Sequence, residues 1–375
     1  MDPESLRADV PAFADCIYLN TGASSPSPRR VVDAATGFLE GQQFDAPCGE
    51  GVYGMATDAR ESARETVAAH LGADPGEIAL TDSTVDGINH VATGIDWEPG
   101  DVVVRTDLEH PAGELPWARM RDLHGVEVRE LSTEQGRLDL DDLKETVADA
   151  RLLCLSSLSW NYGTKLPVAE TVDIAHDAGT QVLVDAVQSP GQMPVDVAQW
   201  GADFIAGSGH KWLLGPWGAG FLYVNEAVLD TLSPRRIGYF GADTVEAEGE
   251  AGGAAAGYEF NPDASRFELG TDAMAPHVGL EAGIETIEAV GLDTVQSRIA
   301  ELTDRLKEGL GDRLLSPRDY ESGLVTFEAE DPDAVVDRLD EAGVRIRSIP
   351  DPHACRVSVH VFNTAGDIDA LLDAL

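Results

Sequence analysis

The clearest hydrophobic pattern in the chain lies between residues 182 and 224. Three short apolar runs, VLVDAV, DFIAG and GFLYV, are separated by polar and glycine-rich segments. Apolar runs of this length are typical of strands buried in a parallel sheet. Polar residues follow the first two runs, and these are Asp185, Gln188, Ser208, His210 and Lys211. Open α/β sheets bind ligands outside the carboxyl ends of their strands, so a functional site is expected there.

The patterns on either side extend this interpretation. Residues 28–70 are helical in pattern, with a glycine and proline break at 47–54. A strand, a turn and a helix are predicted in EIALTDSTVDGINHVATGI, and further strands in DVVVRT and LLCLS. From residue 292 onwards a helix is followed by short strands and helices, which indicates a smaller α+β unit. Residues 241–257 are acidic and rich in glycine and alanine, so we expect a flexible loop there.

Charge and composition exclude several classes of protein. The 375 residues carry a formal net charge of −41, which argues against nucleic acid and anionic membranes as partners. The acidity does not indicate disorder, because 43% of the residues are apolar and occur in well-spaced runs. Adaptation to high salt fits an acidic, lysine-poor surface, and an ordinary acidic protein is the alternative. The chain lacks an apolar run of about 18 residues, so no membrane span is expected.

The four cysteines and the first residues bear on the cellular compartment of the protein. The cysteines show no paired spacing for zinc, so no metal site is predicted, and a reducing cytoplasm fits them best. The opening MDPESLRADVP is acidic and has no apolar core of a signal peptide, so we expect none.

Lys211 is the strongest candidate for a catalytic residue. The sequence contains four lysines, and Lys144 and Lys307 lie near carboxylates in helical patterns, which indicates surface pairing. Lys211 instead lies in SGHKWLLGPWG, among apolar residues and glycines. Such surroundings favour the neutral amine, which can add to the carbonyl group of an aldehyde cofactor. Asp185 is the carboxylate that a pyridinium nitrogen needs as a partner. The alternative is a structural Asp–Lys pair in the core.

The motif DAVQ, followed by SGHKWLLGPWGAGFLYV, resembles the cofactor lysine region of the class V aminotransferase and cysteine desulfurase family. The resemblance extends from YLNTGASSP at residue 18 to CRVSVHVFNT near residue 360. It implies an α/β fold of the fold-type I class, with a mostly parallel mixed sheet between helices. It also implies a large domain at 18–275 that binds pyridoxal 5′-phosphate (PLP), a small domain formed by 1–17 with 276–375, and a homodimer.

The resemblance also implies which residues hold the cofactor. Lys211 binds PLP covalently, Asp185 pairs with the ring nitrogen, and Gln188 hydrogen-bonds the ring oxygen. His110 stacks on the ring and is a third catalytic candidate. The phosphate contacts are expected from Thr84, Val85, Ser208, His210 and, from the neighbouring subunit, Thr271. Locally, Thr84 is a plausible N-cap of a plain helix, and Thr271 is a plausible N-cap as well.

The substrate contacts follow in the same way. Arg356 matches the arginine that binds a substrate α-carboxylate, and Arg347 is a second candidate on the same wall; a surface charge on a strand edge is the alternative. The segment at Ala23 crosses the mouth of the site in the family, although a surface turn explains it equally well. Most relatives have an asparagine where Trp160 stands here, so Asn161 is the alternative source of an amide.

The expected reaction depends on one cysteine. Desulfurases that form a persulfide carry a loop cysteine between the two arginines, but here Cys355 directly precedes Arg356 in a strand-like segment. The chain therefore looks more like the cystine C–S lyase and isopenicillin N epimerase-like branch. We expect a PLP-dependent lyase or aminotransferase acting on a small amino acid, with a cysteine desulfurase as the alternative. A catalytically inactive binding module is a further alternative. A Rossmann-type oxidoreductase is disfavoured, because this chain has no G-x-G-x-x-G motif after an early strand.

Overall fold

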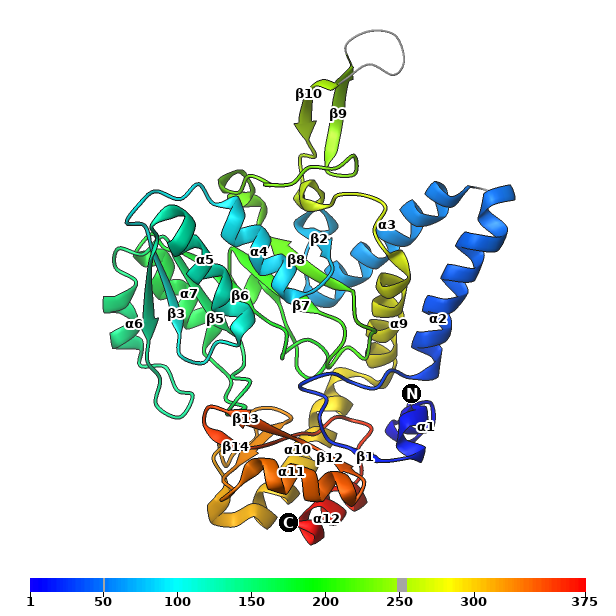
Figure 1. Cartoon of the computed structure of the whole chain (residues 1–375), viewed down its shortest axis with the longest axis vertical. Helices are drawn as coiled ribbons and strands as arrows, with labels where there is room; N and C mark the ends of the chain where they lie inside the picture. The colour runs from blue at the N-terminus through cyan, green and yellow to red at the C-terminus, as the bar shows by residue number, and fades with distance from the viewer. Residues whose placement is uncertain (50, 248–254) are drawn as a thin grey trace.

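The computed structural model describes residues 1–49, 51–247 and 255–375. Its centre is a seven-stranded sheet in the order β2-β8-β7-β6-β5-β3-β4 (Figure 1). The strands are β2 (Ile78–Thr81), β3 (Val102–Thr106), β4 (Glu127–Leu131), β5 (Leu152–Ser156), β6 (Gln181–Asp185), β7 (Phe204–Ser208) and β8 (Gly220–Val224). The mostly parallel mixed sheet predicted from the sequence is confirmed.

Helices cover both faces of this sheet. Apolar side chains of α3, α6, α7 and α9 form one core with one face, and those of α4 and α5 form a second core with the other face. The helices of this part are α2 (Arg29–Glu40), α3 (Val52–Leu71), α4 (Thr84–Gly94), α5 (Leu115–His124), α6 (Leu140–Thr146), α7 (Val168–Asp177), α8 (Val197–Trp200) and α9 (Met274–Val290).

The apolar run GFLYV does not have the parallel direction expected of it. It forms β8, which pairs antiparallel with both β7 and β2. The physical reason is the connection: residues 209–219 join β7 directly to its neighbour and contain no crossover helix, which a parallel neighbour would require. This direct connection carries Lys211.

The C-terminal part forms a second, smaller layer. A three-stranded antiparallel sheet has the order β11-β14-β13, and its core is shared with α10, α11 and α12. The elements are α10 (Leu292–Leu310), β11 (Leu324–Phe327), α11 (Pro332–Glu341), β12 (Val344–Arg345), β13 (Arg347–Pro350), β14 (His353–Ser358) and α12 (Ala365–Ala374).

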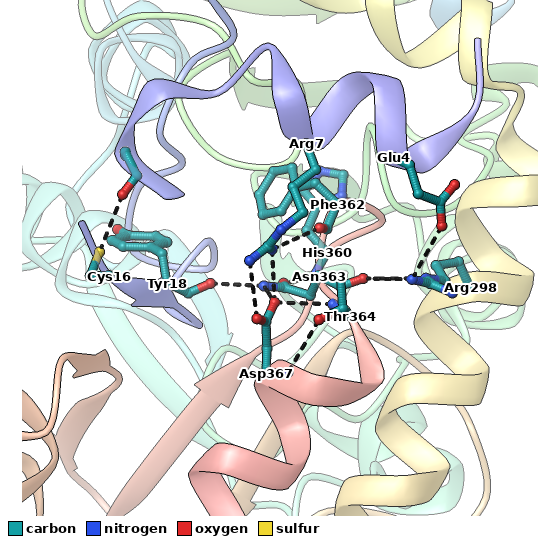
Figure 2. Close-up of polar contacts among 11 residues, drawn as sticks. Glu4, Arg7, Cys16, Tyr18, Arg298, His360, Phe362, Asn363, Thr364 and Asp367 are labelled. Carbon is teal, nitrogen blue, oxygen red and sulfur yellow. Dashed lines mark hydrogen bonds and ion pairs between the residues drawn. The ribbon is translucent and has the colours of Figure 1, made fainter. Parts of the chain in front are cut away.

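The N-terminal segment packs against this layer. Strand β1 (Ile17–Tyr18) pairs with β12, and helix α1 (Pro3–Ala8) is linked to the start of α12 by a side-chain contact. Figure 2 shows Arg7 directed at Asp367, with hydrogen bonds of 2.8 and 3.1 Å between the two side chains. The Asn363 side chain donates to the Tyr18 carbonyl at 3.0 Å. These contacts hold together segments about 350 residues apart in the sequence.

The division into residues 18–275 and 1–17 with 276–375 remains a proposal. Helix α9 crosses position 275, and Leu280 and Ile284 belong to the core of the large sheet. The expected loop at 241–257 is in part a hairpin, because β9 (Ala242–Ala247) pairs antiparallel with β10 (Ala255–Phe260). Residues 248–254 lie outside the described part. Within the described residues, no helix is both long and apolar enough for a bilayer crossing.

Candidate active site

A cavity opens at the carboxyl edge of the large sheet, where β5, β6 and β7 end side by side. Parallel neighbours end at one edge, and this brings residues that are distant in sequence together. Eight of the predicted residues line the cavity, namely Thr84, Val85, His110, Trp160, Asp185, Gln188, His210 and Lys211. Six do not line it, namely Ala23, Asn161, Ser208, Thr271, Arg347 and Arg356.

Lys211 and Asp185 face one another across neighbouring strand ends. Asp185 is the last residue of β6 and is 3% exposed, and Lys211 follows β7 in the connection to β8. Burial lowers the pKa of Lys211 to about 8; attraction to Asp185 opposes this, and repulsion from Arg356 and Arg347 adds to it. Burial raises the pKa of Asp185, against a 2.9 Å hydrogen bond from the Val187 amide and attraction to Lys211. Roughly a tenth of the amine is therefore neutral near pH 7, far more than for an ordinary lysine.

The N-terminus of α4 forms one end of the cavity. Its N-cap is Ser83, whose hydroxyl accepts a hydrogen bond from the Asp86 amide. The prediction of Thr84 as the cap is therefore wrong by one residue. Thr84 instead occupies the first helical position, and its buried Oγ1 has no hydrogen-bond partner among the described residues. A Cβ at Gly220 would lie 2.8 Å from the Ser83 backbone, so glycine lets this turn rest on β8. First-turn amides and a free hydroxyl form a suitable anion site.

His210 lines the cavity, whereas Ser208 supports it from behind. The Ser208 hydroxyl donates to the Ala219 carbonyl at 3.1 Å and therefore accepts from His210 Nδ1 at 2.8 Å. Burial and the charge of Lys211 lower the pKa of His210 to about 4. The prediction that Ser208 binds phosphate itself is not supported by this position, and orientation of the imidazole is the role that its contacts allow.

His110 and Trp160 form the opposite wall. Their rings meet edge to face at 5.4 Å between centroids. His110 Nδ1 accepts the Ala112 amide, which leaves Nε2 as the protonated nitrogen of the neutral ring. Partial burial and repulsion from Lys211, Arg347 and Arg356 lower the pKa of His110 to about 4. The imidazole is therefore neutral at pH 7 and available for stacking.

Glu109 is a residue whose position in the site the sequence did not reveal. Its carboxylate accepts hydrogen bonds from Thr106 Oγ1 at 2.7 Å and from Ser156 N and Oγ at 2.9 and 2.8 Å. Burial raises the pKa of Glu109 to about 7. Because Ser156 pairs with Asp185 in the sheet, Glu109 fixes the loop that carries His110 to the strand beside Asp185.

Arg356 is a buried guanidinium that forms no ion pair with the residues that the structure describes. It is 1% exposed, it donates from Nη1 to the Trp160 carbonyl at 2.9 Å, and its Nε and Nη2 have no partner among the described residues. Burial and the neighbouring Arg347 lower the pKa of Arg356 to about 9. A Cβ on Gly22 would lie 3.2 Å from Arg356 Nη2, so the N-terminal segment passes directly beside this guanidinium. Arg347 is its cross-strand partner.

Two of the predicted substrate contacts have other partners. The Asn161 amide is occupied at both ends, since its oxygen accepts the Ser159 hydroxyl and its nitrogen donates to the Asp351 carbonyl. Trp160, not Asn161, lines the cavity, and the role of Asn161 stays a prediction. The Ala23 amide donates to the Asn20 carbonyl within its own turn, while the adjacent Gly22 approaches Arg356.

Thr271 lies away from this cavity in the same chain. It is exposed, has a φ of 51° and lines a separate hollow with Tyr53, Arg60 and Tyr239. A left-handed conformation is uncommon for a β-branched residue. Helix α9 begins at Met274 with Ala273 as its cap, so the alternative that Thr271 is an N-cap is wrong.

Cys355 and Arg356 lie on opposite faces of β14, because successive strand residues alternate. The Cys355 thiol is fully buried in the core of the small sheet, and its Sγ lies 3.6 Å from the Pro332 carbonyl. Burial raises the pKa of Cys355 to about 11. The expectation of a buried, unreactive thiol at this position agrees with the structure.

Comparison with known proteins identifies the family. The family model for aminotransferase class-V matches residues 17–371. The chain belongs to the class V aminotransferase family. A curated relative named probable cysteine desulfurase, from Methanothermobacter thermautotrophicus, is 34% identical over 100% of this chain and 98% of its own length.

Two solved proteins are similar to this class V chain. The apo structure of the cysteine desulfurase from Thermococcus onnurineus NA1 has a TM-score of 0.91 and 31% identity, covering 100% of this chain and 97% of that one. The cystine C–S lyase C-DES, in complex with cysteine persulfide, has a TM-score of 0.89 and 26% identity, covering 97% and 98%. The fold-type I expectation is thereby confirmed, and this class V protein is a PLP-dependent enzyme rather than a binding module.

The residues present suit PLP. Thr84 Oγ1 is an unpaired buried hydroxyl at a helix N-terminus, which suits a phosphate. Asp185 is a buried carboxylate with one hydrogen bond from a backbone amide, which suits a pyridinium nitrogen. Lys211 is an amine with a lowered pKa in the same cavity.

Proposed function

We propose that this class V enzyme cleaves the C–S bond of cysteine or cystine by β-elimination, with no persulfide on a cysteine of its own site. Cys355, which precedes Arg356 in the sequence, points into the core of the small sheet. A persulfide-forming cysteine needs an exposed thiol of low pKa, and Cys355 has neither property. The β13–β14 connection is also tight, since Pro350 pairs with His353, which leaves no long loop to carry a thiol.

The chain's own residues divide the work of this reaction. When bound, PLP withdraws electrons from the Cα of an attached amino acid. The Arg356 fork holds the α-carboxylate, which orients the Cα–H bond toward Lys211. The neutral fraction of Lys211 removes the Cα proton as a general base. Asp185 stabilises positive charge at the ring nitrogen, and His110 covers one face of the ring.

Product analysis tests this proposal. With cysteine and a reductant, we expect one pyruvate and one ammonia for each sulfide released, and with cystine we expect pyruvate, ammonia and cysteine persulfide. Cys355→Ser should keep the wild-type rate within about twofold, because the thiol contacts no site residue. Cys48→Ser, at an exposed cysteine, is the matched control. The measurements are keto-acid, alanine and sulfide assays on the PLP-loaded proteins.

Cysteine desulfurisation is the second candidate, because curated relatives carry that name. It predicts alanine in place of pyruvate, in amounts equal to the sulfur released. Alanine that disappears in Cys355→Ser would overturn the lyase proposal outright. Alanine that persists in this variant would indicate sulfur transfer to an external thiol. An aminotransferase would release neither sulfide nor alanine from cysteine, and it would form a product only when a keto acid is added.

We also propose that the enzyme is a homodimer adapted to high salt, in which Thr271 reaches the partner's phosphate. Aromatic groups around Thr271 support a covered surface, since Tyr53 and Tyr239 line the same hollow and are 64% and 54% exposed in the single chain. The net charge of −41 on each chain makes association repulsive at low ionic strength. The proposed location is a reducing cytoplasm, which agrees with four free cysteines.

A single titration with salt tests the dimer and the salt adaptation together. We expect light scattering to report a dimer in 2–3 M KCl and dissociation or loss of structure below roughly 0.2 M, where the Debye length exceeds about 7 Å. Thr271→Ala should weaken PLP retention without changing the dimer mass. A monomer at every salt concentration would contradict the homodimer, and a salt-independent dimer would contradict the adaptation.

A further inference from the structure

Trp212, the residue after the candidate cofactor lysine, makes a buried contact with Gln188. The Trp212 indole Nε1 donates to Gln188 Oε1 at 2.7 Å, and both side chains are at most 3% exposed. Gln188 Nε2 in turn donates to the Gly22 carbonyl at 3.0 Å. Gln188 also lines the cavity that contains Lys211 and Asp185.

These two contacts fix the orientation of the Gln188 amide. An indole nitrogen can only donate and a carbonyl oxygen can only accept, so each contact independently places Oε1 toward Trp212 and Nε2 toward Gly22. An amide nitrogen has two hydrogens, and Gly22 takes one of them. The second N–H of Gln188 has no protein acceptor among the described residues. The amide therefore keeps one fixed donor in a residue that lines the cavity.

The backbone of Trp212 is itself fixed by a hydrogen bond from the C-terminal layer. His360 Nδ1 accepts the Val361 amide, so His360 Nε2 carries the proton and donates to the Trp212 carbonyl at 2.9 Å. A Cβ at Gly191 would lie 2.3 Å from that same carbonyl, so only glycine allows this approach. Trp212 packs in the cluster between the two sheets, with Leu324 and Phe362. Its position is thus set by both layers of the molecule.

We propose that Trp212 is a positioning residue that orients Gln188 as a hydrogen-bond donor to the ring oxygen of PLP. The proposal rests on the proposed function and on the expectation that Gln188 faces that oxygen. Without the indole N–H, the Gly22 carbonyl alone still holds the Gln188 amide, so the free N–H is held less firmly toward the ring oxygen. A donor at the ring oxygen stabilises negative charge there, which favours loss of the proton from the linkage between Lys211 and the cofactor.

The test is a pH titration of the visible absorbance of the PLP-loaded enzyme. Trp212→Phe should raise the pKa of the Lys211–cofactor linkage by about half to one pH unit, a three- to tenfold change in proton affinity. Gln188→Ala should raise the pKa by a similar amount. The double variant should show no further shift, because Trp212 acts through Gln188. The charged and titratable groups around Lys211, which are Asp185, Arg347, Arg356, His110 and His210, are unchanged in these variants.

Trp97→Phe is the matched control, since the Trp97 indole also donates a buried 2.7 Å hydrogen bond, to the Ala92 carbonyl. It should leave the linkage pKa at the wild-type value. If Trp212→Phe does not fold, 3-benzothienylalanine at position 212 replaces the indole N–H with sulfur at nearly the same volume.

The possible failures are distinguishable. An unshifted pKa in Trp212→Phe, or additive shifts in the double variant, would overturn the inference alone. A wild-type protein that shows no cofactor absorbance after loading would overturn the proposed function and this inference with it.

Discussion

Replacing Lys211 with alanine should lower kcat by roughly 10³-fold or more, because one change removes both the covalent attachment of PLP and the base that moves the Cα proton. The variant should still bind PLP through the phosphate and Asp185 contacts. Borohydride reduction of the wild-type enzyme, followed by peptide mass spectrometry, should place the reduced cofactor on the peptide that contains residue 211. In Lys211→Ala no peptide should carry it.

Lys144→Ala is the control, because Lys144 is an exposed lysine on α6 and lies outside the cavity lining. Its kcat and its labelled peptide should match those of the wild type. A reduced cofactor on Lys144, Lys165 or Lys307 would contradict the assignment of Lys211. A Lys211→Ala variant with wild-type kcat would do so as well.

The pairing of Lys211 with Asp185 could be predicted because it depends on a simple rule. Two apolar runs in a parallel sheet end at one edge, so the polar residues after them meet there. The large sheet and the small α+β layer were predictable for the same reason, since their strands are short apolar runs bounded by turns. The direction of β8 was not predictable from its own residues, because it is set by the short connection at 209–219.

Several predictions about single residues could not be made correctly from the local sequence. Ser83 and Thr84 are both good N-caps, and only the backbone shows that Ser83 is the cap. Trp160 and Asn161 are adjacent, and the loop conformation decides which of them faces the cavity. Lys307 was expected at the surface, but it is 5% exposed and donates to the Asp319 carbonyl. These outcomes depend on tertiary contacts that local sequence does not contain.

The contacts of Gln188 show the same limit at longer range. Its partners Gly22 and Trp212 lie 166 and 24 residues away in the sequence. Nothing in the DAVQ motif indicates which end of the amide faces the cofactor. The orientation follows only after the fold has brought an obligate donor and an obligate acceptor to opposite ends of one side chain.

Arg356→Gln is the change with the second largest expected effect. Removing the guanidinium deletes charge-assisted hydrogen bonds worth about 1.5–3 kcal/mol each, so kcat/KM for cysteine should fall by roughly 10²–10³-fold. Most of the loss should appear in KM, because the carboxylate is bound in both the ground state and the transition state. Arg356→Lys should recover only part of it, since an ammonium lacks the planar fork. Steady-state kinetics of pyruvate formation measures all three proteins.

Two further comparisons separate substrate binding from a structural role. Cysteamine lacks the carboxylate, so whatever rate it supports should be nearly the same in the wild type and in Arg356→Gln. Arg345→Gln, on strand β12 of the small layer, removes an arginine that pairs with Asp340 and should leave kcat/KM unchanged. A loss of similar size with both substrates would contradict the role of Arg356 as the carboxylate site.

The stability of Arg356→Gln should change in the opposite direction from its activity. In the described structure the guanidinium is buried, lacks an ion-pair partner and leaves Nε and Nη2 without hydrogen bonds. A buried charge of this kind lowers the free energy of unfolding, so a neutral glutamine should leave that free energy unchanged or raise it by about 1 kcal/mol or more. An arginine kept for packing would lose stability together with activity. Urea unfolding of the two proteins at the same salt concentration therefore distinguishes a binding group, which destabilises the empty site, from a group that the fold needs.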